Sequence, residues 1–332
     1  LCADIAKLHQ TKKIVIVCSG AIALGSIKIS SKKTLRRLEE KQAAAAIGQI
    51  DLAHQWKQKL KKYNINTAQL LLTLDDSEIR RRYLNARKTI TALHNNDVIP
   101  IINENDTVAT EEIRYGDNDR LAARVAQIIS ADVLINFSDV DGLYETPKTK
   151  KIIKEVKNIN DKIYSYVENK KNSYGSGGMG TKLDAAKICM NSGCYMAIAN
   201  GKYTNPLNRL VEKNICTWFL PKISSLDARK KWIVSSIGSN GKIHIDNGAS
   251  NALRNGKSLL PAGIIKVEGS FLKGDNILIV DQNGEDCARG ITSFSSDEIS
   301  KVKGLKSDQI EKILGYSSKS EIIHRDDMVK LK

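Results

Sequence analysis

The stretch Gly175-Ser176-Gly177-Gly178-Met179-Gly180-Thr181-Lys182 determines how the rest of the chain is interpreted. Glycine reaches positive φ without a Cβ clash, so a loop rich in glycine can turn backbone N–H groups inward and cradle phosphate oxygens. Leu183, Ala186 and Met190 follow at helical spacing, and the pattern ends before Gly193. The sequence therefore predicts a phosphate-binding loop at the amino end of a helix.

Lys182 is the informative residue of this stretch. A helix N-terminus carries partial positive charge, so it disfavours a cation unless an anion lies there too. The order Thr181-Lys182 reverses the Lys-Ser/Thr ending of a Walker A loop, which excludes a P-loop NTPase. A flexible surface loop with an incidental lysine is the alternative interpretation. The neighbouring motifs must decide between the two.

The composition predicts two domains and no membrane-spanning segment. A chain of 332 residues is long enough for roughly two domains. Its six cysteines form no CxxC pair, so we interpret them as reduced thiols of a cytoplasmic protein. No apolar run approaches the ~20 residues that a bilayer requires. The net charge of +15 is spread along the chain, and residues 221–332 hold 18 lysines and arginines against 14 aspartates and glutamates, which argues against a dedicated nucleic-acid surface.

Strands and helices alternate through residues 1–220. The β-branched run Ile14–Val17 predicts a buried strand, and further strands are expected at 69–73, 98–102, 131–137 and 195–199. The alanine-rich segment Lys41–Gln49 predicts a helix that approaches another element closely. This alternation predicts an α/β fold with a mainly parallel sheet covered on both faces. Ligands of such sheets lie beyond the carboxyl ends of the strands.

Polar side chains gather where these expected strands end. Ser19 follows the first strand, Asp106 ends the run Asn103-Glu104-Asn105-Asp106, and Ser138 and Asp139 follow the strand at 131–137. Packing alone does not explain such a concentration of polar groups, so we expect them to face a cleft. A carboxylate such as Asp139 could hold Mg²⁺ together with nucleotide phosphates. A plain helix N-cap is the alternative for Ser19.

Gly116-Asp117-Asn118-Asp119 opens the helix expected at 121–129. The helix dipole stabilises acidic residues in a first turn, so Asp117 and Asp119 are interpreted equally well as caps or as ligand contacts. Asn118 between them is less readily explained as a cap.

The pattern changes after Trp218-Phe219. Residues 221–240 are interpreted as a linker. Short strands separated by glycine turns then predict a small β-barrel, at Lys242–Ile245, Ile264–Glu268, Asn276–Val280 and Cys287–Thr292. The expected organisation is therefore a first domain at 1–220, a linker at 221–240 and a second domain at 241–332.

Taken in order, these motifs resemble the glutamate 5-kinase family of the amino-acid kinase superfamily over nearly the whole chain. The similar stretches are Val17–Ala23, Lys41–Gln49, Asn103–Asp106, Gly116–Asp119, Ser138–Asp139 with Gly142–Tyr144, and Ser176–Lys182. The tail from Gly241 through Gly256–Gly263 to His324–Met328 is similar to the PUA domain of bacterial members. The resemblance implies a three-layer α/β/α amino-acid kinase domain followed by a barrel-like PUA domain.

The resemblance also implies an activity, namely transfer of the γ-phosphoryl group of ATP to the γ-carboxylate of L-glutamate in the first step of proline biosynthesis. Ser19, Asp106 and Asn118 match the family's glutamate-binding residues. The residues that match its ATP-binding positions are Ser138, Asp139, Ser176, Gly177, Gly178, Met179, Gly180, Thr181 and Lys182. Lys182 is expected to be catalytic, because it would neutralise the transferring group. The family further implies Mg²⁺, a homo-oligomer (dimer or tetramer) and feedback inhibition by proline.

Three alternatives remain at this point. The chain could be another amino-acid kinase, acting on acetylglutamate, carbamate or a nucleoside monophosphate. It could be an RNA-binding protein, since PUA domains often bind RNA, although few aromatic residues in the tail are available for base stacking. It could also be an inactive regulatory relic. Family members begin with a strand that carries a lysine and a Gly-Ser/Thr-Ser turn, and eighteen residues precede Ser19 here. We therefore expect the first strand to be missing and this exact chain to have weak or no kinase activity.

Overall fold

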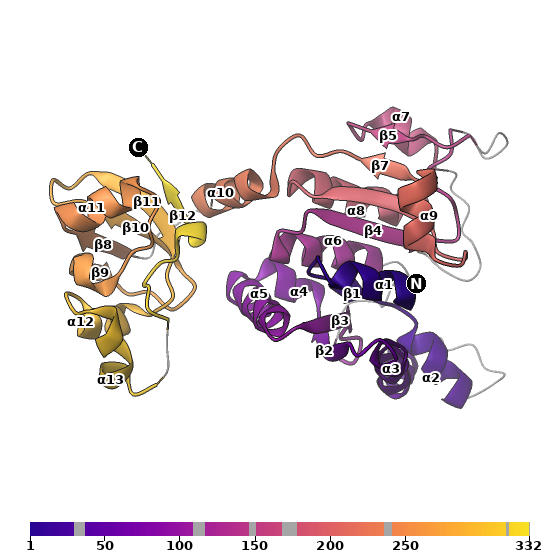
Figure 1. The fold of residues 1–332 in the computed structure, drawn as a ribbon, viewed down its shortest axis with the longest axis horizontal. Coiled ribbons are helices and arrows are strands. Elements are labelled where there is room, and N and C mark those ends of the chain that lie inside the picture. Colours follow the sequence, from indigo (N-terminus) through magenta and orange to yellow (C-terminus); the bar gives the residue numbers. More distant parts are fainter. Residues whose placement is uncertain are drawn as a thin grey trace. The chain divides into compact units, whose positions relative to one another are not determined.

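The computed structural model describes residues 1–29, 37–108, 117–145, 151–167, 178–235, 241–316 and 319–331. The chain divides into two compact units, Leu1–Ser225 and Leu226–Lys332 (Figure 1). Across the described ranges, no helix is both long enough and apolar enough to cross a membrane.

The N-terminal unit contains two hydrogen-bonded sheets in its described part. The first has the order β1-β3-β2, and the second has the order β4-β6-β7-β5. All neighbouring strands are parallel except β6 and β7, which confirms the predicted mainly parallel arrangement. The strands are β1 (Ile16–Val17), β2 (Asn66–Leu72), β3 (Val98–Glu104), β4 (Val133–Ser138), β5 (Glu155–Val156), β6 (Tyr195–Asn200) and β7 (Thr217–Phe219).

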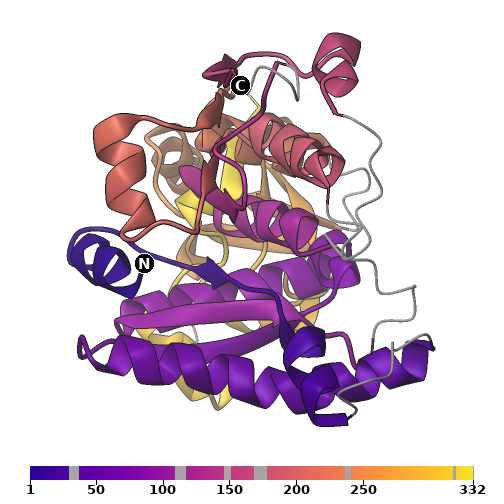
Figure 2. The same cartoon turned by 90° about the vertical axis from the view of Figure 1, so that its right-hand side faces the viewer.

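Helices surround these sheets, and α6 connects them. The helix α6 packs against β1 and β3 of the first sheet, against β4 of the second, and against α8 (Figures 1 and 2). The helices of this unit are α1 (Cys2–His9), α2 (Ala21–Ile29), α3 (Leu38–Lys61), α4 (Leu74–Glu78), α5 (Arg80–Asn95), α6 (Asp117–Ile129), α7 (Asp161–Ser165), α8 (Met179–Asn191) and α9 (Pro206–Lys213). Helix α6 therefore contacts strands of both sheets.

One hydrophobic cluster joins the two sheets. Ile99 and Ile101 of β3 are buried there, and Ile16 of β1 and Ile135 and Phe137 of β4, which are partly buried, pack against the same cluster. Burial of an isoleucine or leucine side chain stabilises a fold by about 1.5–3 kcal/mol relative to its exposure. The β-branched runs that predicted the strands thus supply a core that is shared by the two sheets.

Helices α2 and α3 touch backbone to backbone. A Cβ atom added to Gly25 would lie 1.8 Å from the carbonyl oxygen of Ala44, and one added to Gly48 would lie 1.9 Å from that of Ala21. Only glycine fits at either position. This contact confirms the close approach predicted for the alanine-rich helix. It also holds the turn that precedes α2 against α3.

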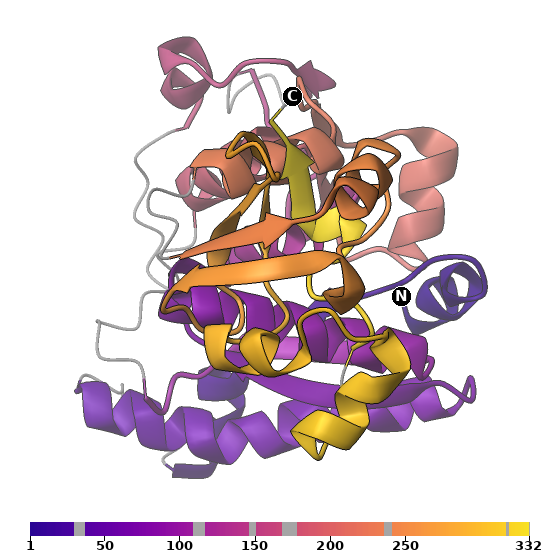
Figure 3. The same ribbon diagram turned by 90° about the vertical axis from the view of Figure 1, so that its left-hand side faces the viewer.

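The C-terminal unit is built on a five-stranded sheet with the order β12-β11-β10-β8-β9 (Figure 3, orange to yellow). The four strands predicted here are confirmed. Ile243, Ile279 and Phe294 are buried in its core. Its elements are β8 (Gly241–Ile245), β9 (Ile264–Gly269), β10 (Asn276–Val280), β11 (Asp286–Ile291), β12 (Met328–Lys330), α11 (Asn247–Arg254), α12 (Ser296–Val302) and α13 (Ile310–Leu314).

Part of the expected linker is an ordered helix, α10 (Ser225–Ser235). The buried guanidinium of Arg229 pairs with the carboxylate of Asp327 and donates from Nε to the Asp326 carbonyl at 3.3 Å. The Asn276 side-chain amide donates to the Ile233 carbonyl at 2.7 Å. These contacts attach α10 to the C-terminal unit, so part of the expected linker at 221–240 is helical and packed.

Candidate functional site

The turns after β1 and β3 lie side by side. The two strands are parallel, and the pairing of Val17 with Ile102 brings their carboxyl ends together. Gly20 adopts a φ of +114°, which lets the chain turn sharply after Ser19, whose side chain is exposed. Asp106 follows β3 and is only 8% exposed. Two predicted substrate contacts therefore occupy neighbouring strand ends.

Asn103 adds a polar group to this edge. It is 2% exposed, and its Nδ2 donates to the Oε1 atom of Gln49 in α3 at 2.6 Å. Its Oδ1 atom is buried without a hydrogen-bond partner in the described structure. A buried amide oxygen left unpaired costs about 1–3 kcal/mol, and a bound ligand that donates a hydrogen bond would offset that cost.

The first turn of α6 provides the central anion of the site. Asp119 accepts three hydrogen bonds: its Oδ2 from Lys182 Nζ at 2.8 Å and from Thr181 Oγ1 at 2.9 Å, and its Oδ1 from Asn136 Nδ2 at 2.7 Å. The Lys182 and Asp119 side chains are only 12% and 15% exposed. Next to them, the Oδ1 atom of Asn118 is buried with no partner among the described residues. This cluster joins α6, α8 and β4.

The position of Lys182 agrees with the sequence argument. The helix α8 begins at Met179 with Gly178 as its N-cap, which places Lys182 in the first turn. The anion that such a lysine needs is the Asp119 carboxylate. Asp119 was predicted equally as a cap or as a ligand contact, and its contacts show that it orients the lysine. A phosphate group at this helix end would meet the same cation.

The turn after β4 is held against β6 and β7. The Ser138 hydroxyl donates to the Asp139 carboxylate at 3.3 Å, and Nδ2 of Asn200 at the end of β6 donates to the Asp139 carbonyl at 3.4 Å. The backbone N–H of Leu143 donates to Thr217 Oγ1 at 2.8 Å. This turn is thus anchored at both ends.

The remaining predicted site residues divide into two groups. Gly178, Met179, Gly180 and Thr181 form the N-cap and first turn of α8. Ser176 and Gly177 lie outside the described residues, and so does Gly116.

The sequence interpretation did not identify Asn136 or the role of Asp119. Asn136 was detectable as a polar side chain within an otherwise apolar strand, and it is 8% exposed. The role of Asp119 depends on Lys182, which lies far along the chain, so local pattern could not reveal it.

Cys18 beside Ser19 is not a nucleophile. Burial raises the pKa of its thiol to about 11, although hydrogen bonds with Trp56 and with the backbone lower it in part. The thiol is therefore neutral at physiological pH, and thiolates rather than thiols react. The chemistry of the site is left to its amine, carboxylate and amide groups.

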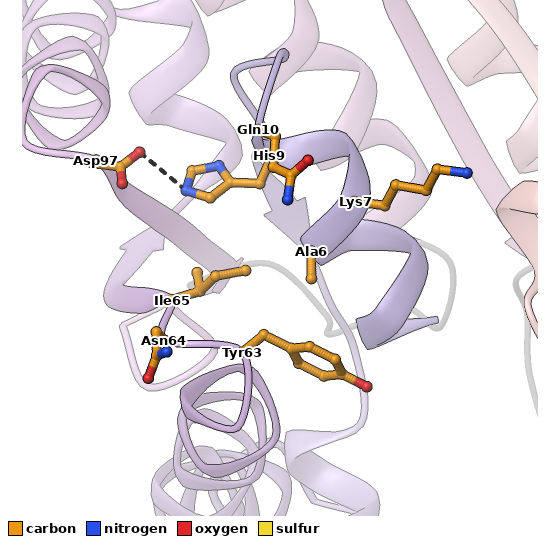
Figure 4. Close-up of a pocket in the computed structure, with 8 residues that line it drawn as sticks. All are labelled: Ala6, Lys7, His9, Gln10, Tyr63, Asn64, Ile65 and Asp97. Atoms are coloured by element: carbon orange, nitrogen blue, oxygen red, sulfur yellow. Dashed lines mark ion pairs between the residues drawn. The ribbon is translucent and has the colours of Figure 1, made fainter.

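A cavity of about 580 Å³ lies elsewhere in this unit (Figure 4). Its walls come from α1, from Tyr63–Ile65 just before β2, and from Asp97 just before β3. His9 lies 3.1 Å from Asp97 within it. This cavity is at the amino ends of the strands, and none of the predicted site residues lines it. We place the site at the carboxyl ends instead, because the buried ion pair and the unpaired amide oxygens are there.

Comparison with known proteins identifies two domains of this chain. The amino acid kinase family model matches residues 1–200, and the PUA domain model matches residues 241–314.

Similar proteins cover the chain almost completely. It is 54% identical to the glutamate 5-kinase of Pelagibacter ubique (strain HTCC1062), over 99% of this chain and 90% of that protein. It is 50% identical to the glutamate 5-kinase of Paramagnetospirillum magneticum (strain ATCC 700264 / AMB-1) and 48% identical to that of Rhodopseudomonas palustris (strain BisB5), again over 99% of this chain, and over 90% and 89% of those proteins.

Proposed function

The chain belongs to the amino acid kinase family, among the glutamate 5-kinases, and on this premise we propose that it phosphorylates the γ-carboxylate of L-glutamate with ATP. In this reaction a γ-carboxylate oxygen forms a bond to the γ-phosphorus, the bond from that phosphorus to the ADP oxygen breaks, and γ-glutamyl phosphate and ADP leave. The step opens proline biosynthesis. The observation that carries the proposal is the buried Lys182–Asp119 pair at the amino end of α8.

Phosphoryl transfer requires two anionic reactants to be held in line and their charge to be neutralised. Lys182 supplies a positive charge at the α8 N-terminus, where the backbone N–H groups add to it. No general base is needed, because the attacking carboxylate is already ionised at neutral pH. The residues of this chain therefore contribute by placing the two reactants and by stabilising their negative charge.

We assign substrate roles by position. Asn118, with its unpaired Oδ1, and Asp106 would bind the ammonium group of glutamate, and Ser19 with its exposed hydroxyl would bind a carboxylate. Ser138, Asp139 and the α8 N-terminus would hold ATP. The assignment is supported by their location at the carboxyl ends of β1, β3 and β4.

Mg²⁺ fits the same region. The Oδ1 atom of Asp141 is buried without a hydrogen-bond partner in the described structure, and Asp139 precedes it in the same turn. Mg²⁺ is usually held by one or two carboxylates together with substrate phosphates, so these two aspartates match its preferred donors. When bound, the ion would neutralise phosphate charge.

Three further features of the proposal rest on family membership alone: inhibition by proline, assembly into a homodimer or homotetramer, and a cytoplasmic location. The alternatives of an RNA-binding protein and of an inactive relic are not favoured, because glutamate 5-kinases cover 99% of the chain.

The test is trapping of the acyl phosphate with hydroxylamine, on the protein expressed from its complete gene. We expect hydroxamate to form with ATP and L-glutamate. Release of ADP, which reports transfer to any acceptor, should not be stimulated by N-acetylglutamate, carbamate or a nucleoside monophosphate. Asn118→Ala should raise KM for glutamate about tenfold, or ~1.4 kcal/mol, with KM for ATP unchanged. Turnover of another acceptor in preference to glutamate would overturn the proposal.

A further inference from the structure

A second ion pair joins the two helices that carry Asp119 and Lys182. Arg120 directly follows Asp119 in α6, and Asp184 lies two residues after Lys182 in α8. The Nη2 atom of Arg120 is 2.9 Å from Oδ2 of Asp184. These side chains are 44% and 40% exposed, so this pair is far more accessible than the Lys182–Asp119 pair.

The two pairs together restrain the first turn of α8. Successive residues of a helix point about 100° apart, so side chains two residues apart leave it about 200° apart. Lys182 and Asp184 therefore contact α6 from two sides of α8. The buried side chains Leu183, Ala185 and Ala186 already hold the body of α8 against its neighbours, so the ion pairs act on its partly exposed first turn, where Lys182 lies. The second contact adds a restraint on another side of this turn, and so on the direction of the Lys182 ammonium group.

Tyr164 ties a third helix to the same carboxylate. Its hydroxyl donates to Oδ1 of Asp184 at 3.2 Å, so both carboxylate oxygens of Asp184 are engaged. Tyr164 belongs to α7, whose Ile163 packs against the hydrophobic cluster that contains Leu183 of α8. Asp184 thus connects α6, α7 and α8 within two residues of Lys182.

The energetics indicate a geometric role rather than a stabilising one. An exposed ion pair contributes about 0–1 kcal/mol to folding, because water and salt screen it. A displacement of about 1 Å at a catalytic group can lower a rate about a hundredfold. We propose that Arg120, Asp184 and Tyr164 are positioning residues that restrain the first turn of α8 and so hold Lys182 toward the transferring phosphoryl group. This inference rests on the kinase activity proposed above.

The experiment compares two ion pairs of α6 in the protein expressed from its complete gene. Arg120→Ala should lower kcat about tenfold, or ~1.4 kcal/mol, with KM for glutamate and Tm nearly unchanged. The matched control is Arg124→Ala, which removes a pair with Glu78 (3.6 Å) one turn farther along α6 and should leave kcat unaltered. Asp184→Ala should match Arg120→Ala, and the double variant should lose no more than either, because the two residues act as one unit.

A second measurement does not depend on turnover. The rate at which acetic anhydride modifies Lys182, followed by mass spectrometry, should rise at least about threefold in Arg120→Ala, as expected when a restraint of about 0.7 kcal/mol is lost. The modification rate should stay unchanged in Arg124→Ala. Arg120→Lys should restore part of kcat and part of the protection of Lys182 from modification.

The outcomes separate the two claims. If the unaltered protein shows no glutamate-dependent turnover, the proposed function fails, and the Lys182 modification rates still decide the inference. If Arg120→Ala behaves as Arg124→Ala in both measurements, or if the losses in Arg120→Ala and Asp184→Ala add, the positioning role is wrong.

Discussion

Two largely buried ion pairs, one in each unit, have similar chemistry and different surroundings. Lys182 and Asp119 are 12% and 15% exposed, and Arg229 and Asp327 are 5% and 24% exposed. The first pair lies at a helix N-terminus beside strand ends. Arg229 instead donates its other hydrogen bond to a main-chain carbonyl and attaches α10 to its unit. Burial of a charge therefore does not identify a site by itself; the proposal that Lys182 contacts a reactant is supported by its place at a helix N-terminus beside strand ends.

The largest predicted effect is the loss of activity when Lys182 is removed from the pair in the N-terminal unit. Lys182→Ala should lower kcat about a thousandfold, or ~4 kcal/mol, because the charge that stabilises the transferring group is lost. Folding should survive, since Asp119 still accepts hydrogen bonds from Thr181 and Asn136. The measurement is the hydroxamate assay together with thermal unfolding. Lys187→Ala, at an exposed position of the same helix, is the control and should retain full activity. Equal losses in the two variants would contradict a catalytic role.

The second prediction concerns the structural pair. Arg229→Met should lower the free energy of unfolding by about 3 kcal/mol, because it leaves the Asp327 carboxylate without its partner. The value of kcat should not change at temperatures where the variant is folded. Urea unfolding measures the effect.

Arg325→Ala is the control for that experiment. The Arg325 side chain is 62% exposed and lies 3.8 Å from Asp326, so its loss should cost less than about 1 kcal/mol. A loss of kcat in Arg229→Met without a loss of stability would remove the distinction between the two pairs.

The smallest predicted effect concerns a partly buried carboxylate of the C-terminal unit, Glu298 in α12. Partial burial alone would raise its pKa, but the hydrogen bonds from the Tyr316 hydroxyl and from the backbone and hydroxyl of Ser295 outweigh this, and the pKa falls below the ordinary value of 4.5. A group whose pKa is lower in the folded state stabilises the fold above its unfolded pKa. That stability is lost as the pH falls through the folded pKa.

The corresponding experiment is urea unfolding between pH 6 and pH 3. The unaltered protein should lose on the order of 0.5 kcal/mol more than Glu298→Gln over this range. Glu311→Gln, at an exposed position, should follow the unaltered protein. A Glu298→Gln variant with the same acid sensitivity as the unaltered protein would show that Glu298 does not contribute.

The sequence predicted those features that local pattern encodes. The run Ile14–Val17 indicated β1, the polar residues after it indicated a ligand-binding edge, and the glycine-rich stretch indicated the start of α8. The short elements β5 and α7 were not predicted, because a few residues carry too little periodicity. The helix α10 was taken for a linker, since its stability comes from Arg229 and its distant partners in the C-terminal unit.

Site residues followed the same division. The sequence drew attention to Lys182 because a cation in a first helical turn is unfavourable without an anion, and its catalytic role stays a prediction. Asn136 and the role of Asp119 were not predicted, because their meaning depends on contacts between α6, β4 and α8 that only the folded chain creates.

The glycine contact between α2 and α3 couples the Ser19 turn to a long helix. Helix α3 has 24 residues and so extends about 36 Å, and it is joined through Gly25 and Gly48 to the helix that Ser19 precedes. Leu60 near the end of α3 is fully buried in the core with Ile99, so a shift of that turn on glutamate binding would be passed along α3 to the core beside β3. A fluorescent or spin label at Lys61 could therefore report substrate capture from a surface remote from the reacting groups.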